Sequence, residues 1–209
     1  MTTDRRDFAI RSDAAVLAAS DPALARAASV AGDFAVRLRS PGFATLIWLI
    51  LCQQVSIEAA EAMFRRLEGI LGPVTPEGLL DLDDATMRRC GFTRQKGGYA
   101  RGLATAAAAG SMPLDDIAGL SDQDAVAALT SLRGVGVWTA ENYLIWALGR
   151  RDVFPVHDLA LQLGWQLLER AEAPVKPHDL EEVAARWSPR RTAAAFLIWH
   201  YYLGRRGRA

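Results

Sequence analysis

The apolar residues of this chain recur with the spacing of helices, and almost no stretch alternates with the period of two that marks a half-buried strand. A capping residue followed by proline is a common helix start. This signal occurs at Asp21-Pro22, Ser40-Pro41, Thr75-Pro76 and Ser188-Pro189. Helices are expected at residues 13–19, 21–31, 41–54, 56–71, 76–82, 84–90, 94–109, 121–131, 137–148, 156–170, 177–187 and 189–203. The pattern predicts an all-α protein of many short helices.

Residues 43–51 are apolar on nearly every side of their predicted helix, which indicates a central buried position. The helix runs into the polar segment Gln53-Gln54-Val55-Ser56. Two readings of this segment stay open. The amides of Gln53 and Gln54 either serve as hydrogen-bonding groups at an active cleft, or they lie in an ordinary helix junction capped by Ser56.

We expect one domain that spans residues 1–209, because this length is enough to bury a core of its own. The helical pattern breaks at the sequence SMPLDD, which suggests two helical lobes with a boundary near residues 110–120 and a cleft between them. Residues 1–12 are polar, and we expect them to be flexible or to add a short extended piece at residues 8–10.

The composition is that of a soluble globular protein, with 51% hydrophobic and 23% charged residues. The formal net charge is +0, so nucleic-acid binding would have to rest on local patches. The two cysteines, Cys52 and Cys90, are too few for a four-cysteine zinc or iron–sulfur site. No apolar run reaches the roughly 18 residues of a membrane span, and the N-terminus lacks the apolar core of a signal peptide. A cytoplasmic protein without a membrane partner is expected.

The turn Leu132-Arg133-Gly134-Val135-Gly136 lies between two apolar helical segments and offers the clearest binding chemistry. Glycines at 134 and 136 let the backbone turn sharply and approach another molecule closely. The helix that follows has free N–H groups and the positive end of its dipole at its start. A turn of this kind is an anion site, and phosphate is a common ligand there.

A second basic segment, residues 91–96, precedes the helix expected at 94–109. Thr93 would cap this helix. Arg94 and Lys96 either contact phosphate or form a solvated helix start, and the residues alone leave both readings open.

Asp158 ends a loop that contains glycine and proline, and it lies at the start of a helix. As an N-cap residue it would stay ionised, because the helix dipole and the backbone N–H groups favour the charged form. A carboxylate near a phosphate-binding turn makes chemical sense where a cation or a cationic transition state must form. His157 beside it is either structural or a weak candidate for a general base, and no group of histidine, cysteine and carboxylate residues has metal-ligand spacing.

Trp138 follows the second hairpin glycine by two residues. An indole at this position either belongs to the core or forms a flat wall for a base or a cation.

Residues 132–140, LRGVGVWTA, resemble the hairpin of the HhH-GPD DNA glycosylases, whose pattern L-P-G-V-G-x-x-T-A is followed by a Gly/Pro loop and an essential aspartate. Asp158 stands at a spacing that suits this aspartate. The segment Gln53-Gln54-Val55-Ser56 is similar to the Q-Q-[IVL]-S segment of the AlkA-type branch, 3-methyladenine DNA glycosylase II. Residues 91–96 resemble that branch's G-[LF]-[ST]-x-x-K segment. The resemblance covers roughly residues 40–203.

Two absences distinguish branches of this family. Members with lyase activity carry a lysine two residues after the second hairpin glycine, where this chain has Trp138, and a Schiff base needs an amine. Several other branches hold a four-cysteine iron–sulfur cluster near the C-terminus, and this chain has no cysteine after Cys90. The chain also departs from the pattern. Arg133 replaces the hairpin proline, and Arg190 stands where the AlkA relatives often have a tryptophan.

The resemblance implies a monofunctional DNA glycosylase of base-excision repair. Such an enzyme flips a nucleotide from damaged double-stranded DNA and hydrolyses the N-glycosidic bond of alkylated purines of the 3-methyladenine and 7-methylguanine class, leaving an abasic site. It acts as a monomer and requires no cofactor beyond a monovalent cation, Na⁺ or K⁺, at the hairpin. It holds no iron–sulfur cluster.

The resemblance also implies roles for individual residues. Asp158 would be catalytic, and the base pocket would contain Trp138, Gln53 and Gln54, with Gln54 the better match to the wedge that fills the vacated position. The DNA contacts would come from Leu132, Arg133, Gly134, Val135, Gly136, Thr139, Arg94 and Lys96. The cation would be held by the backbone carbonyls of Thr130, Leu132 and Val135.

Three alternatives stay open. A non-catalytic HhH DNA-binding module would bind DNA without releasing a base. A helical protein-interaction domain would show no salt-dependent DNA binding. A bifunctional glycosylase/lyase would form a covalent adduct that borohydride traps, which Trp138 in place of lysine argues against.

Overall fold

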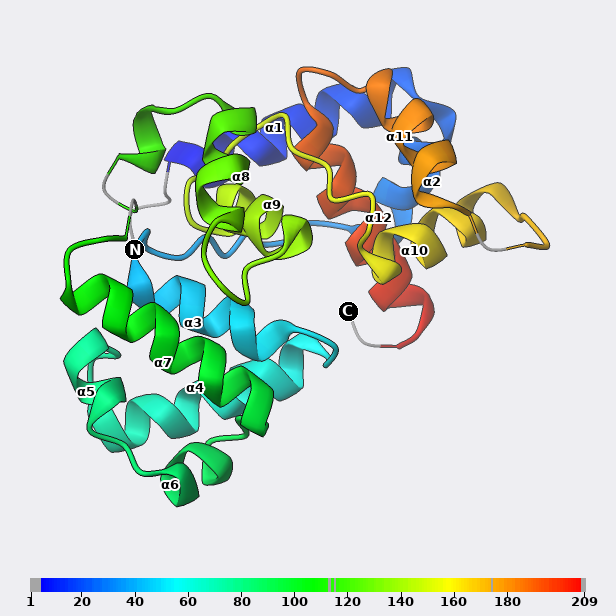
Figure 1. The fold of residues 1–209 in the computed structure, drawn as a ribbon. Coiled ribbons are helices and arrows are strands. Elements are labelled where there is room, and N and C mark those ends of the chain that lie inside the picture. Colours follow the sequence, from blue (N-terminus) through cyan, green and yellow to red (C-terminus); the bar gives the residue numbers. More distant parts are fainter. Residues whose placement is uncertain (1–4, 113, 115, 174, 208–209) are drawn as a thin grey trace. The chain divides into compact units, whose positions relative to one another are not determined.

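The computed structural model describes residues 5–112, 114, 116–173 and 175–207. These residues form twelve α-helices and one short 3₁₀ helix, and no strand occurs among them. In chain order the elements are α1 (Arg5–Ser20), α2 (Pro22–Ala31), α3 (Phe43–Cys52), α4 (Ile57–Leu71), α5 (Pro76–Leu80), α6 (Asp84–Arg89), α7 (Arg94–Ala108), η1 (Ile117–Gly119), α8 (Asp122–Thr130), α9 (Val137–Trp146), α10 (Leu159–Glu169), α11 (Pro177–Ala185) and α12 (Arg191–Arg205) (Figure 1). The predicted all-α architecture is confirmed.

Each predicted helix is present, and several begin at the predicted caps. The side chain of Asp21 accepts hydrogen bonds from the backbone N–H groups of Ala23 and Leu24 at the start of α2. Thr75 and Ser121 cap α5 and α8 in the same way. These caps satisfy N–H groups that have no partner within the helix.

Two of the proline signals do not mark a helix start. The carbonyl of Ser40 accepts a hydrogen bond from Thr45 Oγ1 at 2.6 Å, and α3 begins later, with a glycine as its N-cap. The hydroxyl of Ser188 donates to Asp152 Oδ2 at 2.8 Å, its peptide bond to Pro189 is cis, and α12 begins after these residues. The N-caps predicted at Ser40 and Ser188 are therefore wrong.

The N-terminal segment departs most from the expected fold. Residues 5–12 belong to α1, so the flexible or extended segment expected there is wrong, while residues 1–4 lie outside the described part. Ile10, Asp13, Ala14 and Leu17 are buried along one face of the helix. This face packs against α2 and α12. The burial depends on partners far away in sequence, which the local polarity does not reveal.

The chain divides into two compact units. The hairpin unit comprises residues 39–148, and the carboxylate unit comprises residues 1–38 together with 149–209. The boundary predicted near residues 110–120 is wrong, because α7 and α9, on either side of that segment, both pack against α3. Residues 113 and 115 of the segment lie outside the described part.

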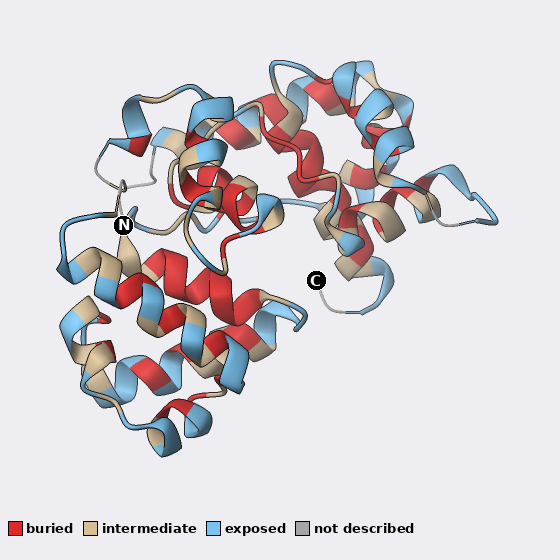
Figure 2. Cartoon of the chain, in the orientation of Figure 1, coloured by how far each residue is buried: buried red, intermediate tan, exposed pale blue. Residues whose placement is uncertain are grey.

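Helix α3 forms the core of the hairpin unit. Every residue from Thr45 to Cys52 is buried, as the apolar pattern predicted, and Figure 2 shows the burial along the helix. Helices α4, α7 and α9 pack against α3, while α5 and α6 contact α7.

Helix α12 has the same role in the carboxylate unit, where it contacts α1, α2, α10 and α11. At Gly164 of α10, an added Cβ would lie 2.7 Å from Ile198 Cγ2 and 3.0 Å from the Ile198 carbonyl oxygen of α12. A side chain does not fit at this distance, so glycine permits the close approach of the two helices. Helix α10 therefore packs closely on α12.

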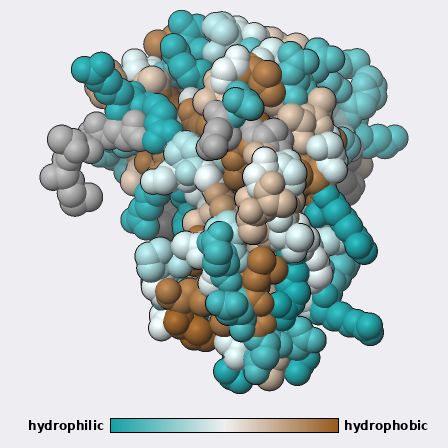
Figure 3. All heavy atoms as spheres, turned by 60° about the vertical axis from the view of Figure 1, so that its left-hand side comes forward, coloured by the Kyte–Doolittle hydropathy of each residue, from teal (hydrophilic) through white to brown (hydrophobic). Residues whose placement is uncertain are grey.

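The face of the molecule seen in Figure 3 is mostly hydrophilic, with smaller hydrophobic groups between the polar side chains. In the part of the chain that the structure describes, no helix is both long enough and apolar enough to cross a membrane.

Candidate functional site

The hairpin turn of residues 132–136 connects α8 to α9. The backbone N–H of Val135 donates to the carbonyl of Leu132 at 3.1 Å and closes the turn. Gly134 has a φ of 91°, and an added Cβ would lie 2.3 Å from Cγ of Tyr99. Both the backbone conformation and the packing against Tyr99 therefore require glycine at this position.

Gly136 is the N-cap of α9 and has a different role. Its φ is −90°, an added Cβ would meet nothing within 4 Å, and no side chain among the described residues caps the helix at this residue. The anion site predicted at the start of α9 stays a prediction.

Gln53 holds the hairpin in place. Its Nε2 donates to the carbonyl of Gly134 at 3.0 Å and to Oγ1 of Thr139 at 3.1 Å. Thr139 is buried, and so is the side chain of Val135. These side chains stabilise the turn from inside, so Val135 and Thr139 present little side-chain surface to a ligand.

Gln54 is presented quite differently from its neighbour. It is exposed, has a positive φ of 58°, and its side chain makes no hydrogen bond to the described residues. A non-glycine residue in the left-handed region is uncommon and costs free energy. The structure thus separates the two amides: Gln53 supports the hairpin, and Gln54 projects from the junction between α3 and α4.

Lys96 does not lie on the surface. Its Nζ donates to the carbonyl of Leu51 in the last turn of α3 at 2.8 Å, and the residue is 9% exposed. Burial lowers the pKa of this ammonium group below its ordinary value. A lysine is favourable at a helix C-terminus, where carbonyls lack partners. The predicted contact between Lys96 and phosphate is therefore wrong.

Arg94 and Arg133 are both exposed, in keeping with a role in binding. They line the same hollow in the surface of the hairpin unit. Thr93 caps α7 as predicted, by accepting a hydrogen bond from the backbone N–H of Lys96. Trp138 is half-buried in the first turn of α9.

Three carbonyls of the hairpin were assigned to a cation by the family resemblance. The Leu132 carbonyl accepts the hydrogen bond from Val135, whereas the carbonyls of Thr130 and Val135 accept none from the described residues. Backbone carbonyls are suitable ligands for hard cations. Two carbonyl oxygens without a donor fit a monovalent cation at this turn.

Asp158 is the N-cap of α10, as predicted. Its Oδ1 accepts hydrogen bonds from the backbone N–H of Leu161 and from Nε1 of Trp199, each at 3.0 Å. Trp199 is on α12, and Phe196 packs edge-on against it with ring centroids 5.5 Å apart. The indole therefore fixes the orientation of the carboxylate. Sequence analysis missed Trp199, because no local pattern links this residue to Asp158.

The loop that leads to Asp158 is anchored at three points. Asp152 pairs with Arg191, whose Nε and Nη2 lie 2.9 and 3.0 Å from its two oxygens. Burial acts to raise the pKa of Asp152, but hydrogen bonds from Arg191 and Ser188 outweigh it, so the pKa is lowered. Thr192 accepts from the Val153 N–H at 3.1 Å and its hydroxyl reaches the carbonyl of Arg150 at 2.7 Å.

The third anchor reaches back to α1. Asp13 is buried and accepts hydrogen bonds from Nε and Nη2 of Arg151 at 2.8 and 2.6 Å. Nε of Arg190 donates to the same carboxylate at 3.1 Å. Arg190, which stands where relatives often have a tryptophan, thus belongs to this ion-pair network and supports the loop.

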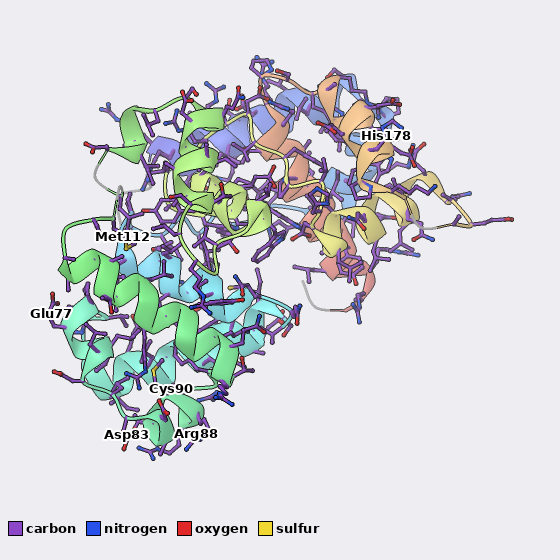
Figure 4. All side chains as sticks on the ribbon, in the orientation of Figure 1. Glu77, Asp83, Arg88, Cys90, Met112 and His178 are labelled. Carbon is purple, nitrogen blue, oxygen red and sulfur yellow. The ribbon has the colours of Figure 1, made fainter. Side chains whose placement is uncertain are left out.

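The cysteines and histidines do not form a reactive group. Cys52 is buried, and burial raises the pKa of its thiol to about 12. Figure 4 labels Cys90 at the end of α6 and His178 on α11, which belong to different units. Among the described residues, no group of histidine, cysteine and carboxylate side chains is arranged to hold a metal.

Comparison with known proteins connects this geometry to a family. The family model described as HhH-GPD superfamily base excision DNA repair protein matches residues 47–190. DNA-3-methyladenine glycosylase 1 of Schizosaccharomyces pombe is 37% identical over 161 residues, which cover 74% of this chain and 69% of that protein. DNA-3-methyladenine glycosylase 2 of Escherichia coli is 27% identical over 178 residues, 78% of this chain and 60% of that protein.

Solved structures agree with these matches. The S. pombe 3-methyladenine DNA glycosylase in complex with abasic DNA superposes with a TM-score of 0.82, at 29% identity, over 90% of this chain and 95% of that chain. A DNA-3-methyladenine glycosidase from Bacillus halodurans gives a TM-score of 0.72, also at 29% identity, over 89% of this chain and 87% of that chain. The family model and the sequence similarity show that the chain belongs to the HhH-GPD superfamily of base excision DNA repair proteins.

Proposed function

We propose that this protein is a monofunctional DNA glycosylase that releases alkylated purines, of the 3-methyladenine and 7-methylguanine class, from double-stranded DNA and leaves an abasic site. The observation that carries the proposal is the carboxylate of Asp158, held as an N-cap by Leu161 and oriented by Trp199. Trp138 stands where a lyase would need an amine. The relatives named as 3-methyladenine glycosylases support the substrate class.

The chemistry of the substrate suits these residues. A purine methylated at N3 or N7 carries a positive charge, which weakens its glycosidic bond and reduces the need for leaving-group protonation. Trp138, which is half-buried, would stack on a flipped, cationic base, a contact worth about 0.5–2 kcal/mol. Such a contact favours the damaged base over its neutral counterpart.

In the reaction, the bond between C1′ and the base nitrogen breaks and its electron pair leaves with the base. Asp158 stabilises the positive charge that develops on the sugar. Its carboxylate also orients a water molecule and takes its proton as the water oxygen bonds to C1′. Trp199 acts through Asp158 as a positioning residue, since it holds one carboxylate oxygen in place.

In this proposal, the hairpin unit binds the DNA backbone. The N–H groups at Gly134 and Gly136 hold a backbone phosphate without reading sequence. A monovalent cation on the carbonyls of Thr130, Leu132 and Val135 would add positive charge at that phosphate. Gln54, exposed at the junction of α3 and α4, is the proposed wedge. The protein acts as a monomer in this proposal.

The test is to incubate the protein with methylated duplex DNA and to identify the bases set free. We expect free 3-methyladenine or 7-methylguanine, strands that stay intact until treated with alkali, and no protein–DNA adduct after borohydride reduction. DNA binding without any free base would show a non-catalytic binding module, and a borohydride-trapped adduct would show a lyase. Either result would overturn the proposal.

A further inference from the structure

A surface hollow lies beside the hairpin turn, within the hairpin unit. It is lined by Arg94, Gln95, Gly98, Tyr99 and Arg133. Four of these residues come from the first part of α7, and Arg133 comes from the turn itself. Tyr99 joins the two segments, because its ring fills the space where Gly134 has no side chain. The hollow is thus continuous with the turn that is proposed to bind a DNA phosphate.

The charges in the hollow are unbalanced. Neither Arg94 nor Arg133 makes a hydrogen bond or an ion pair with the described residues, and none of the lining residues is acidic. Other arginines of the same unit are paired, such as Arg39 with Glu61 at 3.0 Å and Arg101 with Asp84 at 3.0 Å. Two cations that share a hollow without a counter-charge repel each other, and a bound anion relieves this repulsion.

The hollow also has neutral donors. Nε2 of Gln95 donates to the hydroxyl of Tyr99 at 2.7 Å. The hydroxyl accepts in this bond and keeps its own O–H as a donor. Two guanidinium groups and a phenol O–H form a set of donors that suits the several oxygens of a phosphate.

Three contacts connect the segments that carry the hollow. Lys96 ties α7 to the end of α3 through the carbonyl of Leu51. Gln53, directly after α3, ties that end to Gly134 of the hairpin. Tyr99 of α7 packs against the same glycine, so α7 also contacts the hairpin directly. The segments that carry Arg94 and Arg133 are thus connected through Lys96, Gln53 and Tyr99.

We infer that this hollow is a second phosphate-binding subsite, which takes a DNA backbone phosphate close to the one held by the hairpin N–H groups. The inference rests on the proposed function, because it assigns to the ligand the chemistry of a DNA strand. Phosphates repeat along each strand about every 3.4 Å of rise, so a strand that meets the turn presents further phosphates nearby. The subsite explains how a chain of formal net charge +0 concentrates positive charge where DNA binds.

A phosphate contact has a signature that a structural role does not share. Each phosphate neutralised by a protein cation releases counterions, and it adds about 0.9 to the slope of log affinity against log salt for duplex DNA. At about 0.1 M salt, one such contact is worth close to tenfold in affinity. The effect is independent of sequence and lesion, because phosphates carry no base information.

The first test uses the double variant Arg94→Gln/Arg133→Gln and a duplex with a stable abasic-site analogue. We expect the salt slope of binding to fall by about 1, with an equal loss of affinity for an undamaged duplex. Both side chains are exposed and unpaired, so the thermal unfolding temperature should stay near that of the wild type. An unchanged slope would overturn the inference, as would a loss confined to the abasic duplex.

The second test introduces a side chain into the hollow at Gly98. Gly98 and Gly102 are both exposed in α7, and an added Cβ meets nothing within 4 Å at either position. Gly98 lines the hollow and Gly102 does not. Gly98→Glu should weaken binding by about tenfold and lower the salt slope, Gly98→Gln should have a smaller effect, and Gly102→Glu should stay close to the wild type. Equal effects of the two glutamate variants would contradict the subsite.

These outcomes are distinct from failure of the proposed function. If wild-type protein releases no base from methylated DNA, the glycosylase proposal fails whatever the salt slopes show. If base release occurs and the slopes of the variants match the wild type, the subsite alone is wrong.

Discussion

The hairpin turn and the carboxylate of Asp158 are held by different kinds of contact. In the hairpin unit, a short continuous segment forms the turn, and Gln53 and Tyr99 support it at Gly134. In the carboxylate unit, Asp158 is held by Trp199 from another helix, and the loop before it is anchored by Asp13 from α1. The turn is largely encoded in its own sequence, whereas the carboxylate depends on residues far along the chain. Substitutions in the hairpin should therefore change DNA affinity, and substitutions around Asp158 should change the rate of base release.

The largest expected effect on stability comes from Gly134→Ala, which changes the turn that is proposed to bind DNA. The new Cβ would lie 2.3 Å from Tyr99 Cγ, and alanine is strained at a φ of 91°. We expect the free energy of unfolding to fall by about 2–4 kcal/mol, with a loss of DNA affinity. Denaturant unfolding and DNA titration measure the two effects.

The matched control is Gly136→Ala, two residues away, where φ is −90° and the Cβ meets nothing within 4 Å. It should cost no more than about 1 kcal/mol of stability. Equal destabilisation by the two variants would show that the packing on Tyr99 does not determine the turn.

The next prediction concerns Trp199→Phe, which changes the contact that orients Asp158 and should therefore slow base release. The variant removes the indole donor to Asp158 and keeps an aromatic ring against Phe196. We expect base release under single-turnover conditions to slow by about tenfold, while affinity for an abasic-analogue duplex stays near the wild type. The split between rate and affinity is what distinguishes a positioning residue from a general support of the fold.

Trp187→Phe is the control for Trp199→Phe. It also removes an indole hydrogen bond to a carboxylate in the same unit, from Nε1 to Asp21 at 2.9 Å. Stability should fall at least as much, because Trp187 is buried more completely than Trp199, whereas base release per folded molecule should not change. A rate loss as large as that of Trp199→Phe would mean that the rate reports stability and not the orientation of Asp158.

The smallest effect is on pH dependence. His200 stacks on Phe34, with centroids 4.8 Å apart, and burial lowers its pKa from the ordinary value of 6.5. Because the folded-state pKa lies below that of the unfolded chain, the stabilising contribution is complete above pH 6.5 and is lost as the pH falls below that value. Unfolding measured from pH 7.5 to 5.5 should show this decline, and His200→Phe should reduce it. An identical decline in the variant would assign the effect to other groups.

Local patterns predicted the elements whose neighbours in sequence determine them. Helix α3 followed from an all-round apolar run, and Asp158 as an N-cap followed from its place before an apolar helix. The N-terminal helix α1 did not, because a buried face of Ile10, Asp13, Ala14 and Leu17 is concealed among polar residues and has meaning only against α2 and α12.

The candidate site was predicted to a similar extent. The glycines of the turn were singled out by residue type, Asp158 was correctly predicted as an N-cap, and its catalytic role was implied by the family resemblance. Lys96 was misassigned, because its charge indicated the surface while its actual partner is a carbonyl of α3. Trp199 and Asp13 were not found, since contacts between residues this distant in sequence arise only from tertiary packing.

Asp158→Asn tests the central claim most directly, with base release and DNA affinity measured on the same protein. The amide oxygen can still accept from Leu161 and Trp199, so the local structure should persist while the negative charge is lost. We expect release of alkylated purines from methylated duplex DNA to fall by at least about a hundredfold, with affinity for an abasic-analogue duplex preserved or increased. Release at the wild-type rate would contradict the assignment of Asp158 as the catalytic group.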